Sequence, residues 1–148
     1  APASGLAPAN GTMERYRLQE WLNFITSELH KGFTPLFIAS MPDEGKAIYR
    51  AKLRERFEWV NSQLAGKTWL MGDTFTVADA YLFTVQNWAH LVGVQLSGLT
   101  ELDAWRARLM AVGSSPRLFF HPASDYGPDE RLLPGVVARS GFQHNPER

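Results

Sequence analysis

The stretch from Ala80 to Val92 constrains the fold more than any other part of the sequence, because its apolar residues fall on nearly every face of the helix that they would form. A helix of that kind has to be surrounded by other helices. Just before it, Thr76 and Asp79 stand three residues apart, which is the spacing of a capping box at the first turn of a helix. We therefore predict a buried central helix and assign Thr76 and Asp79 a structural role as its N-cap pair.

Three other segments show the periodicity of amphipathic helices. Apolar residues recur every three or four positions from Thr12 to about Gly32, from about Asp43 to Ala65 and from Ser97 to about Val112. The first of these helices is expected to end near Gly32, because Pro35 follows it. The sequence shows no pair of strands with hairpin signals. We therefore predict an all-α fold, a helical bundle of four or five helices around the buried central helix.

The composition changes at both ends of this helical region. Residues 1–11 are rich in proline, alanine and glycine, and we predict that they form a linker. We expect a helical domain over residues 12–112. From residue 113 to residue 148, prolines and glycines recur and the apolar periodicity fades, so we predict an atypical tail that is loosely packed or disordered.

The charge and the residue content argue against several classes of function. The 15 Lys and Arg residues balance 15 Asp and Glu residues, which argues against nucleic acid or an anionic membrane surface as a partner. No apolar run reaches the length of about 20 residues that a membrane-spanning helix needs. The sequence has no cysteine and its histidines are too scattered for a zinc site, so we expect no metal.

Two stretches are similar to a known family. The Glu-Leu-His-Lys-Gly-Phe run at residues 28–33, within the wider stretch 20–37, resembles the first helix of the C-terminal domain in beta-class (bacterial) glutathione S-transferases. Residues 70–81, Leu-Met-Gly-Asp-Thr-Phe-Thr-Val-Ala-Asp-Ala-Tyr, resemble the segment of those enzymes that carries a buried N-capping box. The resemblance covers roughly residues 6–109, and the Pro-rich tail beyond does not match the family.

The resemblance implies that this chain is the helical, C-terminal half of a cytoplasmic detoxification enzyme that conjugates glutathione to a small hydrophobic electrophile. In this family glutathione is a co-substrate, held mostly by a thioredoxin-like domain, and the full-length protein is a homodimer. The sequence contains no thioredoxin-like half, so we expect the chain alone to be inactive. The alternative is a stand-alone helical module that binds a ligand or a protein without catalysis.

The resemblance also implies roles for five residues. His30 and Lys31 would be catalytic and lie beside the sulfur of glutathione. Phe33 and Trp88 would be walls of the electrophile pocket, and Asn23 would touch glutathione in the dimer. The chemistry suits the two basic residues, because a nearby cation favours a thiolate over a thiol and an imidazole can donate a hydrogen bond to it or shuttle its proton.

Each of these residues also has a plain structural interpretation, which the sequence leaves open. Basic residues in the last turn of a helix complement its dipole, which would explain His30 and Lys31. Trp88 and Phe33 would be core residues, and Asn23 would be a solvated side chain on a helix flank. The resemblance favours a functional interpretation of His30 and Lys31 and leaves the two aromatic residues balanced between core and pocket.

Overall fold

The computed structural model describes residues 5–112 of the 148-residue chain. The predicted tail over residues 113–148 and the first four residues of the predicted linker lie outside this part. Residues 5–112 form helices and loops, with no β-strand beyond an isolated bridge between Trp69 and Gly72. None of the described helices is long and apolar enough to cross a membrane. The predicted all-α fold is confirmed.

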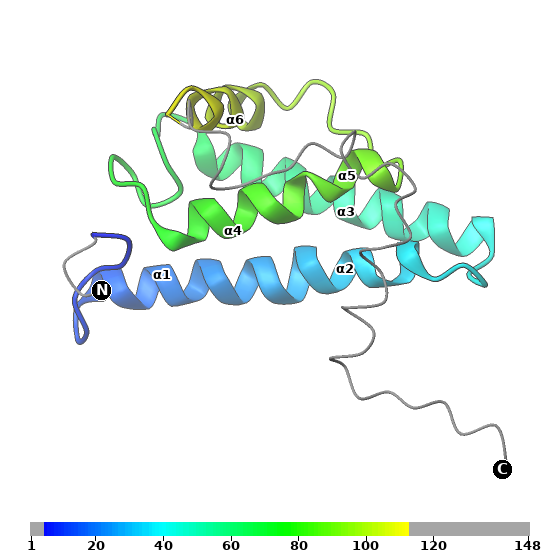
Figure 1. The fold of residues 1–148 in the computed structure, drawn as a ribbon, viewed down its shortest axis with the longest axis horizontal. Coiled ribbons are helices and arrows are strands. Elements are labelled where there is room, and N and C mark those ends of the chain that lie inside the picture. Colours follow the sequence, from blue (N-terminus) through cyan, green and yellow to red (C-terminus); the bar gives the residue numbers. More distant parts are fainter. Residues whose placement is uncertain (1–4, 113–148) are drawn as a thin grey trace, which may run out of the picture. The chain divides into compact units, whose positions relative to one another are not determined.

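The first helical stretch runs without a break through four segments of different pitch. It comprises α1 (Met13–Phe24), a π-helical turn (Ile25–His30), α2 (Lys31–Phe33) and a 3₁₀ turn (Thr34–Phe37). Together they form the long rod along the bottom of Figure 1. The rod begins where predicted, since Thr12 is the N-cap of α1 and its hydroxyl accepts a hydrogen bond from the Arg15 amide at 3.2 Å.

Two hydroxyl residues lie in the π-helical turn and bond to carbonyls of the preceding turn. Thr26 Oγ1 donates to the carbonyl of Leu22 at 2.8 Å, and Ser27 Oγ donates to that of Asn23 at 2.9 Å. These side chains compete with backbone amides for the carbonyls of the preceding turn. The amide of Lys31 reaches back five residues to Thr26, which is the hydrogen-bond step of a π-helix.

The predicted end of this stretch near Gly32 is wrong. The helical path continues through Pro35, which lies in the first turn of the 3₁₀ segment, where its missing N–H costs nothing. Ile38 then ends the path with extended backbone. Gly32 has a packing role, since a Cβ there would lie 2.9 Å from Leu53 Cδ2 on α3 (Asp43–Leu64). Glycine at this position admits a close approach of two helices.

The other helices pack around this rod. Both α3 and α4 (Val77–Gln86) contact it, while α6 (Thr100–Val112) packs on α3. In Figure 1, α4 lies between α1 and α6. The second predicted helix matches α3, whose apolar stripe is buried, and the fourth begins at Thr100, three residues later than predicted.

The predicted central helix is present but divided in two. Its first part, α4, is the buried helix that the apolar pattern predicts, and it ends before Asn87. The side-chain amide of Asn87 donates to the Phe83 carbonyl at 2.9 Å. The short helix α5 (Trp88–Leu91) follows, and Gly93, with a φ of +75°, turns the chain away. Trp88 therefore stands at the junction of two helices.

The start of α4 is held by one carboxylate. Thr76 and Asp79 form a capping box, and Asp79 is fully buried (0% exposed). Its Oδ2 accepts from the Thr76 amide at 3.0 Å and from the Thr76 hydroxyl at 3.2 Å. Its Oδ1 accepts from the Leu70 amide at 2.9 Å and from Trp105 Nε1 at 3.0 Å. One side chain thus connects the loop before α4, the first turn of α4 and helix α6.

Candidate functional site

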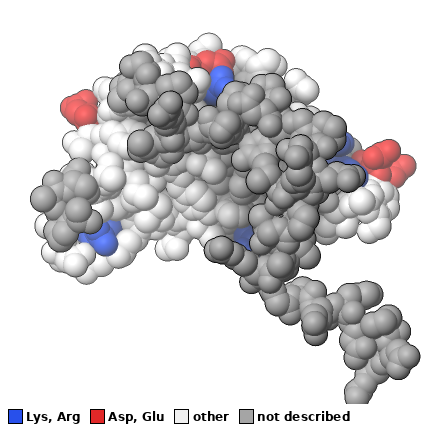
Figure 2. All heavy atoms as spheres, viewed as in Figure 1, with Lys and Arg blue, Asp and Glu red and all other residues white. Residues whose placement is uncertain are grey.

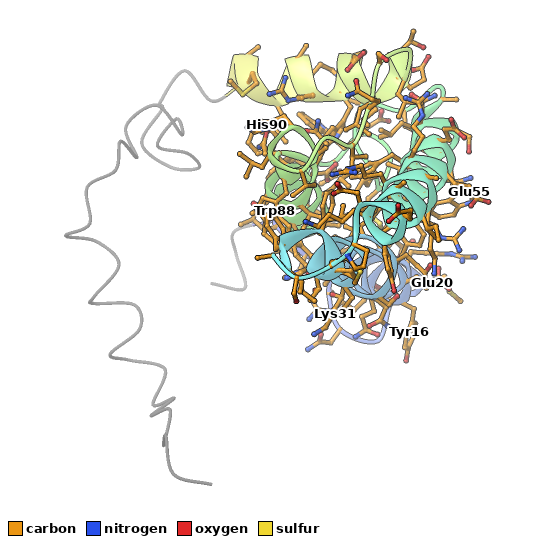
Figure 3. The ribbon with its side chains drawn as sticks, turned by 90° about the vertical axis from the view of Figure 1, so that its right-hand side faces the viewer. Tyr16, Glu20, Lys31, Glu55, Trp88 and His90 are labelled. Atoms are coloured by element: carbon orange, nitrogen blue, oxygen red, sulfur yellow. The ribbon has the colours of Figure 1, made fainter. Side chains whose placement is uncertain are left out.

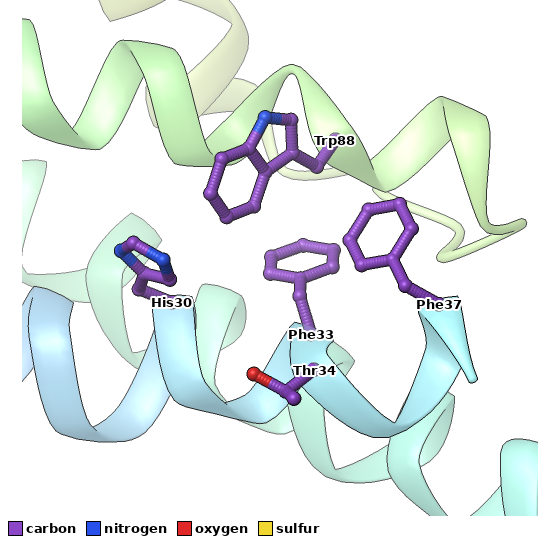
Figure 4. Close-up of a pocket in the computed structure, with 5 residues that line it drawn as sticks. All are labelled: His30, Phe33, Thr34, Phe37 and Trp88. Carbon is purple, nitrogen blue, oxygen red and sulfur yellow. The ribbon is translucent and has the colours of Figure 1, made fainter. Parts of the chain in front are cut away.

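An aromatic pocket lies at the end of the first helical stretch. His30, Phe33, Thr34, Phe37 and Trp88 line a cavity of about 190 Å³ (Figure 4). Four of these residues follow one helical path at steps of three, one and three residues, so they share one face of it. Trp88, the first residue of α5, lies above them and closes the pocket from the other side.

Trp88 is the centre of the aromatic contacts in this pocket. The ring centroids of His30, Phe33 and Phe37 lie 4.9, 5.8 and 6.1 Å from its own, at interplanar angles of 83°, 89° and 86°. Edge-to-face contacts of this kind are favourable beyond the area that they bury. They orient the indole while leaving it half-buried. A flat apolar ligand would therefore meet an aromatic surface that is already ordered.

The two phenylalanines of the pocket differ in exposure. Phe33 is fully buried (0% exposed) and also contacts Phe57, with the ring centroids 6.2 Å apart, so it forms the floor of the pocket. Phe37 is 53% exposed and forms an outer wall. Phe37 is not among the pocket residues predicted from the sequence. Its spacing of four residues from Phe33 would place both on one face of a helix, but the helix was predicted to end near Gly32.

Among the residues that line the pocket, His30 has the titratable side chain. Its imidazole is half-buried, and Nδ1 lies 2.7 Å from the hydroxyl oxygen of Tyr81 on α4. That hydroxyl is also 3.3 Å from Thr26 Oγ1. An imidazole can donate or accept a hydrogen bond, depending on its tautomer. The site thus combines apolar walls with one ring nitrogen that can act on a polar or anionic group.

The structure does not bring Lys31 or Asn23 into this pocket. Lys31 is exposed, because successive helical residues are turned by about 100° and only His30 of the pair faces Trp88. Figure 3 shows Lys31 well below Trp88 at this end of the bundle. Asn23 is exposed on α1, about two turns before His30.

On the part of the described surface that Figure 2 shows, the blue and red side chains are scattered and form no large cluster. Among residues 5–112, no three His, Asp or Glu side chains come close enough together to hold a metal ion. The pocket is therefore best suited to an apolar group joined to one that a histidine can contact.

Comparisons with known proteins identify a family that shares this fold. A family profile described as "Glutathione S-transferase, C-terminal domain" matches residues 24–112. The chain is 48% identical over 104 residues to glutathione S-transferase GstA of Escherichia coli O157:H7, a match that covers 70% of this chain and 51% of that protein.

Two solved structures are similar in fold and in sequence. A ternary complex of BphK, a bacterial glutathione S-transferase, has a TM-score of 0.70 and 48% identity, covering 76% of this chain and 55% of that one. A sphingomonad glutathione S-transferase complexed with glutathione has a TM-score of 0.70 and 37% identity, covering 78% and 56%. The chain therefore spans little more than half the length of the relatives it matches.

Proposed function

Because this chain belongs to the glutathione S-transferase family and matches the C-terminal domain of its bacterial beta class, we propose that it forms the electrophile side of an active site for glutathione conjugation. The observation that carries the proposal is the aromatic pocket, in which His30 lies edge-on to Trp88 with centroids 4.9 Å apart. The reaction needs a cavity for an apolar electrophile and a polar group near the attacking sulfur. The pocket supplies the apolar cavity, and His30, which lines it, is the polar group in this proposal.

His30 acts on the sulfur of glutathione in this proposal. A hydrogen bond from an imidazole N–H stabilises a thiolate relative to the thiol. The thiol releases its proton to solvent, the thiolate attacks the electrophilic carbon, a carbon–sulfur bond forms, and the leaving group departs with its electron pair. Lys31, exposed on the neighbouring face of the helix, contributes its positive charge to the field around the sulfur, and this field is screened by solvent.

The apolar residues bind the electrophile. Phe33 supplies the floor and Trp88 the ordered face against which a flat substrate packs. Phe37 joins them as the exposed outer wall. The substrate is therefore a small hydrophobic electrophile with a planar group, because most of the lining is aromatic. Asn23 lies outside the pocket of its own chain. In this proposal it contacts the glutathione bound to the other subunit of the dimer.

The remaining parts of the proposal concern the complete enzyme. Glutathione is the co-substrate, held mostly by a thioredoxin-like domain, and no metal takes part. The working form is a cytoplasmic homodimer that serves in detoxification. A helical module without catalysis finds no support among the relatives reported above, since GstA and BphK are both named as glutathione S-transferases.

Calorimetric titration with S-(2,4-dinitrophenyl)glutathione tests the proposal on the chain as it stands. We expect this conjugate to bind more tightly than glutathione, because its aromatic ring enters the pocket. Trp88→Leu should weaken binding of the conjugate about tenfold or more, which corresponds to about 1.4 kcal/mol. The matched control is Trp59→Leu, since Trp59 is 43% exposed on α3 and contacts Trp21 and Phe24 outside the pocket. Equal affinities for all three proteins, or no binding at all, would overturn the proposal.

A further inference from the structure

Tyr81 connects the buried helix α4 to the histidine of the pocket. Its hydroxyl oxygen lies 2.7 Å from His30 Nδ1, and the two ring centroids are 5.9 Å apart at 71°. The two residues are separated by 51 positions in the chain. The packing of α4 against the π-helical turn brings these two residues together. The direction of the hydrogen bond decides what His30 can offer a ligand.

The hydrogen bond that Thr26 donates limits the hydrogen bonds that the Tyr81 hydroxyl can make. Thr26 Oγ1 lies 2.8 Å from the Leu22 carbonyl, which can only accept, so the single hydroxyl proton of Thr26 is used there. Towards Tyr81, at 3.3 Å, Thr26 can then only accept. The phenol proton therefore has two acceptors in reach, His30 Nδ1 at 2.7 Å and Thr26 Oγ1 at 3.3 Å.

The distances favour donation from Tyr81 to His30. A separation of 2.7 Å is typical of a bond with a hydroxyl donor, whereas bonds with an N–H donor centre on about 2.9–3.0 Å. An unprotonated imidazole nitrogen is also the better acceptor, and the contact with Thr26 is long. With Nδ1 occupied as an acceptor, the neutral ring carries its proton on Nε2.

We propose that Tyr81 is a positioning residue, whose hydroxyl donates to Nδ1 of His30 and holds the imidazole in the tautomer that presents Nε2–H to the pocket. Within residues 5–112, Nε2 has no hydrogen-bond partner, and the ring is part of the pocket lining. His30 then meets an anion in the pocket as a hydrogen-bond donor. For catalysis this inference rests on the proposed function, and it means that His30 stabilises a thiolate and does not collect the thiol proton.

The tautomer can be read directly by long-range ¹H–¹⁵N correlation spectra of the ¹⁵N-labelled chain, at a pH where the ring is neutral. The His30 signals are assigned by their loss in His30→Gln. We expect the wild-type chain to show Nε2 protonated and Nδ1 as a hydrogen-bonded acceptor. In Tyr81→Phe, the Nδ1 signal should shift to that of an unbonded nitrogen, and the second tautomer should become populated.

Two control variants separate this role from general packing. Tyr49→Phe removes the hydroxyl of another half-buried tyrosine, for which the described residues offer no hydrogen-bond partner, and should leave the His30 signals unchanged. Thr26→Val should also keep the wild-type tautomer, because the Thr26 proton goes to Leu22. A wild-type ring protonated on Nδ1 would overturn the inference, as would identical His30 signals in the wild type and Tyr81→Phe. The tautomer is read without any ligand, so failure of the proposed function, seen as absent binding in the calorimeter, is a separate result.

Discussion

The two ends of the α4–α5 segment are built in opposite ways. At the start of α4, Asp79 is fully buried, and donors from Thr76, Leu70 and Trp105 occupy both of its oxygens. At the other end, Trp88 is half-buried beside a cavity, and the His30 ring makes one hydrogen bond within the described residues, to Tyr81. The first end has no capacity left for a ligand. The second keeps both space and a free ring nitrogen.

This difference separates stability from function along one buried segment. A buried polar group whose hydrogen bonds are all satisfied makes the structure around it rigid, and losing it strands the donors that it served. A ligand pocket needs the opposite, an ordered but incompletely covered surface. We therefore expect substitutions at the Asp79 end to lower the free energy of unfolding, and substitutions at the Trp88 end to act mainly on ligand binding.

The largest expected effect is that of Asp79→Ala. The substitution leaves the Leu70 amide and Trp105 Nε1 buried without their acceptor and removes half of the capping box. We expect the free energy of unfolding, measured in urea, to fall by about 3 kcal/mol or more. Asp73→Ala, in the exposed loop nearby, should change it by less than about 0.5 kcal/mol. A loss below about 1 kcal/mol for Asp79→Ala would show that the hydrogen bonds at this end of the segment contribute little to the free energy of unfolding.

Trp88→Leu should have a smaller effect on stability. The indole is half-buried and its contacts are with rings that stay packed, so we expect a loss of about 2 kcal/mol in the same urea experiment. The circular dichroism spectrum should keep its helical form, while the affinity for the glutathione conjugate falls. A destabilisation as large as that of Asp79→Ala would mean that Trp88 belongs to the core, and the division between the two ends would fail.

A pair of glycine substitutions examines the close packing near the pocket. In Gly32→Ala, the new Cβ would lie 2.9 Å from Leu53 Cδ2, and Leu53 is buried. We expect a loss of about 1–2 kcal/mol from overpacking. In Gly45→Ala the same distance separates the Cβ from Met41 Sδ, on a half-buried and flexible side chain. That variant should be neutral or more stable, by up to about 1 kcal/mol from helix propensity. Equal losses would show that Leu53 does not confine Gly32.

The smallest expected effect concerns the helix that carries Trp105. Asn61 on α3 caps α6, because its Oδ1 accepts from the amides of Glu101 and Leu102 at 3.0 Å each. Asn61→Ala should cost about 1 kcal/mol in thermal or urea unfolding. Ser62→Ala removes an exposed hydroxyl next to it, which bonds only to the Trp59 carbonyl, and should stay within about 0.5 kcal/mol of the wild type.

Much of the fold follows from local sequence patterns. The buried stripe of α3 has the helical period, and the capping spacing of Thr76 and Asp79 marks the start of α4 correctly. These features depend on residues within a few positions of each other, so periodicity and capping rules can identify them. The resemblance that rests on residues 28–33 and 70–81 is likewise confirmed by the family profile.

What the sequence did not reveal depends on distant partners. Gly32 resembles a helix end but makes room for Leu53, which lies 21 positions further along the chain. Trp105 bonds to Asp79 and Tyr81 bonds to His30 across 26 and 51 positions, and no local rule links such pairs. His30 and Lys31 are neighbours in sequence, yet only His30 lines the pocket. The functional roles of His30, Lys31, Asn23, Phe33 and Trp88 remain predictions for the experiments above.

The π-helical turn at Ile25–His30 also limits how the length of this segment can change. Deleting one residue within it would restore an ordinary α-helix with all its backbone hydrogen bonds, so the helix itself would tolerate the loss. A π-helical turn holds one residue more than an α-helical turn, so the residues on its two sides would keep nearly the same orientation about the helix axis. Leu18 would stay in the core, and His30 and Phe33 would still face Trp88. The same deletion within α1 would instead rotate the residues on its two sides by about 100° relative to each other, so the segment can lose a residue in the π-helical turn but not in the regular helix before it.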